Sequence, residues 1–386
     1  MKIPVLDLKP QIAAHRAEIM EAINSVVDAT NFILGPEVAE LEKAVASYTG
    51  AKHAIGVASG SDALLIALMA LGVGNNDAVI TTPYTFFATV GAISRLGALP
   101  IFVDIRPNSF NIDVELAAER LKKGCEPDPA TGLPRDKTSG RLVRAIIPVH
   151  LYGQCADMGA VMALARQHNI SVVEDAAQAL GAQCNGIRAG SIGHIGCLSF
   201  YPTKNLGGFG DGGMITTSDD ALAEQCRIIR VHGSKPKYYH ALVGINSRLD
   251  AIQAAVLRVG LKYLDQWASM RREHARTYTE SLRDTRGIVV PLALPGQHHV
   301  FNQYVIRSGR RDALKKFLTD EGIGTEIYYP LPLHVQQCFS GLGHKKGDFP
   351  ESERAASESL AIPIFPYLTT EQRKTVTDAI KRFQES

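Results

Sequence analysis

From residue 54 onward, short apolar segments alternate with longer segments whose apolar residues recur at helical spacing. Short apolar segments are typical of buried strands, and the periodic segments are typical of amphipathic helices. We expect strands over 54–58, 78–82, 100–103, 145–150 and 171–174, and helices over 63–71, 87–96, 158–168 and 221–231. The alternation predicts an α/β fold, with a mostly parallel sheet that helices cover on both faces.

The two ends of the chain depart from this alternation. Residues 12–27 and a segment that opens at Pro36 have a helical pattern, and the last part of the chain mixes helices with strands. We therefore expect a large domain over 1–255 and a smaller α+β domain over 256–386. Residues 123–141 are poor in apolar side chains and are expected to form a surface insertion, either a hairpin or a lid. Toward the C-terminus, helices are expected over 249–267, 271–283, 311–321, 351–359 and 370–383, and strands near 288–291 and 302–307.

Composition narrows the kinds of partner. Of 386 residues 21% are charged, and the formal net charge of +2 gives no reason to expect nucleic acid or an acidic membrane surface as a partner. No apolar run approaches the roughly 20 residues of a membrane helix, and the N-terminus lacks the pattern of a signal peptide, so we expect a cytoplasmic protein. The six cysteines form no C-x-x-C pair and are expected to be reduced. The histidines show no ligand spacing, so no metal site is expected.

Candidate chemistry centres on a glycine-rich segment, residues 197–217, which contains Lys204. Five glycines follow the lysine, and glycines at this density let the backbone approach a ligand closely. A desolvated lysine loses its proton readily and can form a Schiff base with an aldehyde. We therefore interpret Lys204 as the residue that bonds pyridoxal phosphate. Taken alone, a turn with a solvated lysine is the commoner explanation of such a segment.

An acidic residue at the end of an expected strand supports this interpretation. Asp175 follows Glu174 at the carboxyl end of 171–174, and such ends carry the ligands of parallel sheets. A carboxylate that faces the pyridine nitrogen of the cofactor keeps that nitrogen protonated, so the ring can accept electrons. Glu174 is expected to point to the other face and to be structural. Gln178 could hydrogen-bond near the ring oxygen, and a helix cap is the alternative role for Asp175.

Two further strand-to-helix junctions offer a phosphate site and a stacking face. Gly60 begins a helix whose free amides could bind a phosphate, although Ser59 or Ser61 could simply cap that helix. In the segment 83–89, one of three aromatic side chains could stack on the cofactor ring while the others pack in the core. The agreement of these separate segments is a stronger indication than any one of them.

The sequence resembles the sugar aminotransferases of the DegT/DnrJ/EryC1/StrS family, which are fold type I pyridoxal-phosphate enzymes. The resemblance covers nearly the whole chain. It is carried by SGSDAL at 59–64, PVHLYGQ at 148–154, EDAAQ at 174–178, SFYPTKNL at 199–206, GINSRL at 244–249, and by residues 7–8, 33–38 and 362–366.

The resemblance implies a role for each site residue. Lys204 bonds the aldehyde of pyridoxal 5'-phosphate and Asp175 faces its pyridine nitrogen. The remaining cofactor contacts are implied for Gln178 (ring oxygen), Phe86 (stacking), Gly60, Ser61 and Ser199 (phosphate) and Asn246, which reaches in from a second subunit. The implied assembly is therefore a homodimer with shared active sites. Ser61 stands where threonine is frequent and preserves the hydroxyl.

The implied reaction moves an amino group from L-glutamate to a nucleotide-linked keto-sugar. Residues 246–248 and 364–366 are more similar to members that aminate the 3-position than to those that aminate the 4-position. Tyr329 is expected to border the sugar pocket. Arg248 or His334 could meet a diphosphate or carboxylate, and a salt bridge or cap is an equal alternative for both.

Three alternative functions have to be compared with this one. A 4-keto-sugar aminotransferase is the nearest alternative. Relatives that use pyridoxamine phosphate for dehydration carry histidine in place of Lys204, so the lysine argues against a dehydratase. A non-catalytic regulatory or scaffold dimer would need degraded site residues, and the sequence shows none.

Overall fold

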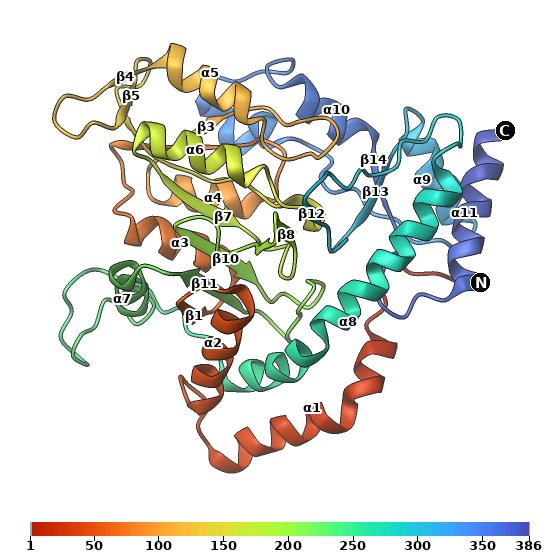
Figure 1. Cartoon of the computed structure of the whole chain (residues 1–386), viewed down its shortest axis with the longest axis horizontal. Coiled ribbons are helices and arrows are strands. Elements are labelled where there is room, and N and C mark those ends of the chain that lie inside the picture. Colours follow the sequence, from red (N-terminus) through yellow and green to blue (C-terminus); the bar gives the residue numbers. More distant parts are fainter. Residues whose placement is uncertain (1, 386) are drawn as a thin grey trace.

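The computed structural model describes residues 2–385 and is built around one large, mostly parallel sheet (Figure 1). In spatial order its main strands are β1 (His53–Val57), β11 (Gly213–Thr217), β10 (Ile195–Ser199), β7 (Ser171–Asp175), β6 (Leu142–Ile146), β2 (Asp77–Thr81) and β3 (Leu99–Phe102). From β10 to β3 every neighbouring pair is parallel, and β11 runs antiparallel to both of its neighbours. The predicted α/β class and the mostly parallel sheet are confirmed.

Helices cover both faces of this sheet. One face packs against α3 (Gly60–Ala70), α4 (Phe87–Arg95) and α7 (Asp220–Ile229), and the other against α2 (Pro36–Thr49), α5 (Val114–Gly124), α6 (Met158–His168) and the first part of α8 (Ala251–Leu282). Successive strand residues alternate between the two cores: Ala78 and Ile80 of β2 belong to the second, and Val79 to the first. Burial on both faces explains why these strands are continuously apolar in the sequence.

A smaller α+β unit follows along the chain. Strand β13 (Tyr304–Arg307) pairs antiparallel with β14 (Ser359–Ile362), and α9 (Arg311–Asp320), α11 (Thr370–Glu385) and the end of α8 share their core. The remaining elements include α1 (Lys9–Ala29), α10 (Pro350–Glu358) and a small sheet of β8 (Gln183–Cys184), β9 (Ile187–Arg188) and β12 (Gln297–His298).

Two expectations for this part of the chain are wrong. The helices expected over 249–267 and 271–283 are one continuous helix, α8, because no glycine or proline separates them. Figure 1 shows α8 running from the large sheet to the small unit, and position 255/256 lies within this helix, while the division into two domains stays a prediction. The strand expected near 288–291 is reduced to an isolated bridge between Val289 and Arg307, and Pro291 cannot donate to a ladder.

The insertion at 123–141 is a hairpin and not a lid. Strands β4 (Cys125–Pro127) and β5 (Pro134–Asp136) pair antiparallel, and Arg135 of β5 pairs with Leu142, the first residue of β6. The hairpin therefore extends the sheet at the amino end of β6, beside α5 in Figure 1. Ligands of a parallel sheet bind at the opposite, carboxyl ends. Within residues 2–385, no helix is both long and apolar enough to cross a membrane.

Candidate active site

A cavity of about 480 Å³ opens at the carboxyl ends of β1, β2, β7 and β10. Its wall is built from residues that follow each of these strands and β6, together with residues from the segments before β11 and β13 and after α9. The residues expected in the site that line it are Gly60, Ser61, Phe86, Asp175, Gln178, Ser199, Lys204 and Tyr329. The structure thus brings together segments that lie far apart in the sequence.

Asp175 is placed by the alternation of strand β7. Val173 packs on the α3, α4 and α7 side, so Glu174 faces the opposite core and Asp175 faces back toward α4. Asp175 is 6% exposed, and its Oδ2 accepts a hydrogen bond from Thr89 Oγ1 at 2.7 Å, while its Oδ1 accepts one from the amide of Ala177 at 3.2 Å. These two donors fix the carboxylate at the cavity wall.

The neighbouring acid, Glu174, is structural as expected. Its carboxylate is fully buried and accepts hydrogen bonds from the backbone amides of Gly190, Ile192 and Gly193. It also accepts a hydrogen bond from His150 Nε2 at 2.8 Å, because His150 Nδ1 accepts from the Ala156 amide and the ring proton must therefore sit on Nε2. Glu174 thus ties the 187–194 loop to the sheet and leaves Asp175 as the acid of the cavity.

Lys204 lies in a turn that backbone bonds hold in place. Its amide donates to the carbonyl of Tyr201 at 2.9 Å, and Phe200 bonds through its amide and carbonyl to Gly212 and Gly208. Among residues 2–385, no hydrogen bond or ion pair engages the Lys204 amine. Burial lowers the pKa of this amine, an effect that the nearby Asp175 carboxylate opposes only in part. A half-buried, unpaired amine of lowered pKa is suited to attack an aldehyde.

The junction between β1 and α3 forms an anion cradle. Ser59 caps the helix, since its Oγ accepts from the Asp62 amide at 3.1 Å, and this leaves the exposed Ser61 free to face the cavity. A Cβ added to Gly60 would lie 2.7 Å from Ser199 Cβ, so glycine alone permits this approach of helix and strand. The amides of the first helical turn have no partner within the helix and attract an anion such as a phosphate.

The three aromatic residues of 83–89 are separated by the structure. Tyr84 is fully buried and Phe87 stacks on Phe339 with ring centroids 5.5 Å apart. Phe86 lines the cavity, is 54% exposed, and lies 5.9 Å from the ring of Tyr329. Phe86 is therefore the aromatic residue of this segment that presents a free face to a ligand.

A hydrogen-bonded pair closes the side of the cavity nearest the small unit. Gln178 Oε1 accepts from the Tyr152 amide at 2.7 Å, and its Nε2 donates to the Tyr329 hydroxyl at 3.1 Å. Burial raises the pKa of Tyr329, and the negative charge of Asp175 adds to this effect, so the hydroxyl stays protonated at neutral pH. The Tyr329 amide donates to the Tyr84 hydroxyl at 3.2 Å, which anchors the tyrosine to the large sheet.

Three expected site residues do not line the cavity of this chain. His334 is fully buried and its Nε2 lies 3.0 Å from Glu353 Oε1, which is the pairing expected as the equal alternative to a contact with substrate. Arg248 is half-buried and lies outside the cavity wall. Asn246 is exposed and also lies outside it, in a segment whose neighbour Ser247 bonds to Asp62.

Some wall residues were not anticipated from the sequence. They include Thr85, His150 and Gln303 on the wall itself, and Thr89 behind it. Thr89 lies in the first turn of the expected helix over 87–96, and Thr85 precedes that helix by two residues. These positions were the only available signal. Gln303 is far in sequence from the strands whose carboxyl ends form the cavity, and no pattern in the sequence indicated that it would lie there.

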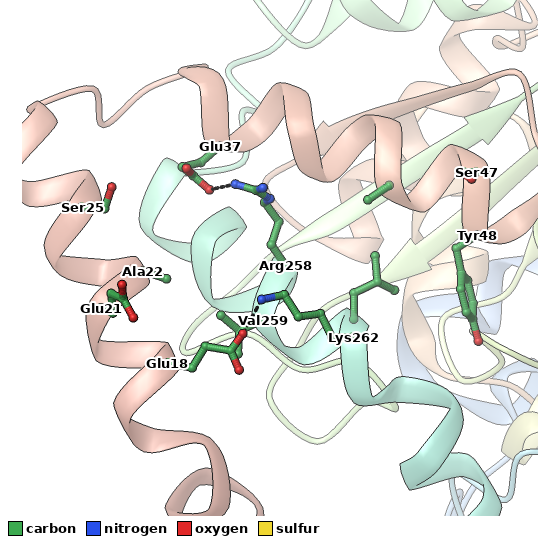
Figure 2. A pocket seen from close by; sticks show the side chains of 12 residues that line it. Glu18, Glu21, Ala22, Ser25, Glu37, Ser47, Tyr48, Arg258, Val259 and Lys262 are labelled. Carbon is green, nitrogen blue, oxygen red and sulfur yellow. Dashed lines mark hydrogen bonds and ion pairs between the residues drawn. The ribbon is translucent and has the colours of Figure 1, made fainter.

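A second and wider cavity, of about 770 Å³, lies between α1, α2 and α8 (Figure 2). Figure 2 shows that its charged side chains point toward one another: Glu37 pairs with Arg258, and Glu18 with Lys262. This cavity holds none of the strand-end residues described above. We therefore assign the chemistry to the smaller cavity.

The residues of the smaller cavity fit pyridoxal 5'-phosphate. An unpaired lysine stands where an aldehyde could be bonded, a fixed carboxylate where a ring nitrogen could be held, and an exposed aromatic face where the ring could stack. The glycine cradle beside Ser61 and Ser199 suits a phosphate. Fold and site together define a pyridoxal-phosphate enzyme of the aminotransferase fold.

Comparison with known proteins gives the family. The model of the DegT/DnrJ/EryC1/StrS aminotransferase family matches residues 13–381. The chain belongs to this family, and its members' cofactor, pyridoxal phosphate, is also the cofactor of this aminotransferase.

Two curated relatives are similar over nearly their whole length. A "Pleiotropic regulatory protein" of Geobacillus stearothermophilus is 51% identical over 385 residues, which is 99% of each chain. A UDP-N-acetyl-3-dehydro-alpha-D-glucosamine 3-aminotransferase of Acidithiobacillus ferrooxidans is 43% identical, covering 98% of this chain and 97% of the relative.

Two solved structures share the fold. The S. venezuelae protein DesV, described in complex with a ketimine intermediate, is 40% identical with a TM-score of 0.93, covering 100% of this chain and 99% of DesV. NtdA of Bacillus subtilis, described with bound cofactor PMP, is 28% identical with a TM-score of 0.87, covering 100% of this chain and 86% of NtdA. The predicted aminotransferase-like fold is confirmed.

Proposed function

We propose that this aminotransferase moves an amino group from L-glutamate to the 3-keto carbon of a nucleotide-linked sugar. The observation that carries the proposal is the placement of Lys204 and Asp175 on one cavity wall. The sugar class and the position are supported by relatives named for 3-amino or 3-dehydro nucleotide sugars, such as the Acidithiobacillus enzyme and a dTDP-3-amino-3,4,6-trideoxy-alpha-D-glucose transaminase of Streptomyces venezuelae.

In this proposal each side chain of the wall has a distinct task. Bound pyridoxal phosphate supplies an aldehyde that bonds amines and a ring that accepts electrons. The free amine of Lys204 takes the proton from the α-carbon of the amino donor, acting as a general base. It would then deliver this proton to the C4′ carbon of the cofactor, acting as a general acid. Asp175 holds a proton at the ring nitrogen, and Phe86 and Tyr329 exclude water from the reacting atoms.

The substrate assignment is tested with a panel of nucleotide-linked 3-keto and 4-keto sugars, each offered with glutamate. We expect amino-sugar and 2-oxoglutarate to form in equal amounts with a 3-keto member, and glutamate alone to shift the cofactor absorbance near 400–430 nm by driving the first half-reaction. Turnover confined to 4-keto members would contradict the assignment of the 3-position. A spectrum that glutamate leaves unchanged would contradict the choice of donor.

The proposal includes a homodimer. Asn246 does not line the cavity of its own chain, and exposed apolar side chains lie in segments near it. Phe32 and Ile33 are 45% and 50% exposed, and Tyr238 and Val243 are 79% and 91% exposed. Exposed apolar groups of this size mark interaction surfaces. Ile33 is bridged to Asp250, and Asn246 follows Val243 by three residues, so Asn246 is well placed to reach a neighbouring copy.

Mixing two impaired variants tests the shared site. In a dimer of one Asn246→Ala chain and one Lys204→Ala chain, one site regains both intact residues if Asn246 comes from the partner subunit. Random mixing should then restore about a quarter of wild-type activity, since half the dimers are mixed and each has one intact site. If both residues acted within one subunit, mixing would restore none.

The cysteines support a reducing compartment. All six thiols are free, and all except Cys338 are buried. Since disulfides are rare where thiols are kept reduced, we place the protein in the cytoplasm, which cell fractionation would test.

A non-catalytic regulatory dimer is the second candidate, because a 51% identical relative is named as a regulatory protein. The intact cavity favours the enzyme: a protein that had lost catalysis would have no need to keep an unpaired lysine beside a fixed carboxylate. Turnover of any keto-sugar in the panel would decide between the two.

A further inference from the structure

Two threonine hydroxyls connect the cavity wall to the carboxylate of Asp175. Thr85 Oγ1 lies 2.9 Å from Thr89 Oγ1, and Thr89 Oγ1 lies 2.7 Å from Asp175 Oδ2. All three side chains are buried, with exposures of 2%, 0% and 6%. Thr85 lines the cavity, so the chain of hydroxyls begins at the wall and ends at the acid.

Counting the hydroxyl protons shows which group donates in each of these hydrogen bonds. Thr89 has one hydroxyl proton and donates it to Asp175. Its oxygen can therefore only accept in the contact with Thr85, so Thr85 is the donor there. Both protons point toward the carboxylate. The second oxygen of Asp175 is held by the Ala177 amide at 3.2 Å, and each carboxylate oxygen keeps a lone pair free.

Buried threonines in helices commonly bond their own backbone instead, as Thr49 does: its hydroxyl donates to the Val45 carbonyl at 2.8 Å. Thr89 lies in the first turn of α4 and Thr85 precedes that helix; within residues 2–385, the hydroxyl of Thr89 makes no such bond to a helix carbonyl. Their hydrogen-bonding capacity is directed to Asp175. This distinguishes Thr89 from helical threonines that only fill space or bend a helix.

We infer that Thr85 and Thr89 form a two-hydroxyl relay that orients the Asp175 carboxylate toward the cofactor's ring nitrogen. Thr89 is the positioning residue and Thr85 fixes the hydroxyl of Thr89. The inference rests on the proposed role of Asp175 and adds the reason why that carboxylate holds one orientation. Neither threonine touches the reacting atoms in this scheme, so both act through Asp175.

The test follows the ring nitrogen directly, with pyridoxal phosphate labelled with ¹⁵N in the ring and bound to the protein. Thr89→Val keeps the branched shape but removes the hydroxyl. In this variant the pH at which the ring nitrogen loses its proton should fall by about one unit, which corresponds to a tenfold lower affinity of the nitrogen for the proton. We expect kcat to fall roughly 10-fold while KM for glutamate changes less than about twofold, since a hydrogen bond to a charged group is lost. In Thr85→Val, the titration pH of the ring nitrogen and kcat should also fall, but by less than in Thr89→Val.

Rescue and a matched control make the result specific. Thr89→Ser keeps the hydroxyl and should restore the nitrogen titration, whereas Thr49→Val, an equally buried helical threonine, should leave it unchanged. An unchanged titration in both Thr89→Val and Thr85→Val would overturn the relay. Because the nitrogen is read without any sugar, failure of every keto-sugar in the panel would count against the substrate assignment alone.

Discussion

Lys204→Ala is expected to leave the fold nearly intact and to abolish turnover. The amine engages no hydrogen bond or ion pair within the described part of the chain and is half-buried, so its loss breaks no structural contact. The same amine is both the bonding group and the proton carrier of the proposed reaction. A general base alone contributes about 10²- to 10⁴-fold, so we expect a loss at or beyond the upper end of this range. Steady-state rates and thermal unfolding of the purified variant check both parts.

Two companion variants separate chemistry from charge. Lys204→Arg keeps a positive charge but cannot give up its proton at neutral pH, so it should be as inactive as the alanine variant. Lys346→Ala removes an exposed lysine outside the cavity and should retain full activity. Substantial turnover by purified Lys204→Ala protein would count against the assignment of Lys204.

Asp175→Asn is expected to lower kcat by about 10²- to 10³-fold, comparable to the loss of a preorganised electrostatic group in other active sites. The asparagine oxygen can still accept from Thr89, while its NH2 group replaces the oxygen that accepts from the Ala177 amide, so the size of the side chain is kept and one weak hydrogen bond is lost. What is lost is the negative charge that holds a proton at the ring nitrogen, and with it the ability of the ring to draw electrons from the donor's α-carbon. Single-turnover measurement of the glutamate half-reaction isolates this step.

The matched control is Asp284→Asn, which makes the same chemical change at a side chain that is 92% exposed. It should alter neither the half-reaction nor the cofactor spectrum. Near-normal rates in Asp175→Asn would remove the electrostatic role of Asp175, even if the cofactor remained bound.

Much of the site could be predicted because a parallel sheet collects its strand ends. Period-two alternation along β7 was enough to send Glu174 to one core and Asp175 to the cavity. Glycine at position 60 marked a close approach, which the contact with Ser199 explains. These are local rules, and they were sufficient wherever one strand and its following turn define the geometry.

The features that the sequence did not indicate depend on packing between distant segments. For His334 the sequence left a substrate contact and a salt bridge equally open, because its partner Glu353 lies 19 residues away and no local rule joins the two. The Thr89 contact with Asp175 joins a helix to a strand 86 residues later. Strand β14, which pairs with β13, directly continues α10, and a helical pattern does not show where such a transition falls.

The central claim is that the amine of Lys204 bonds the aldehyde of pyridoxal phosphate. Reduction of the holoenzyme with borohydride, followed by digestion and mass spectrometry, fixes the cofactor to whichever residue holds it. The account predicts a single phosphopyridoxyl group on the peptide that contains Lys204. A label on another lysine, or a protein that never develops the band near 400–430 nm with the cofactor, would contradict it.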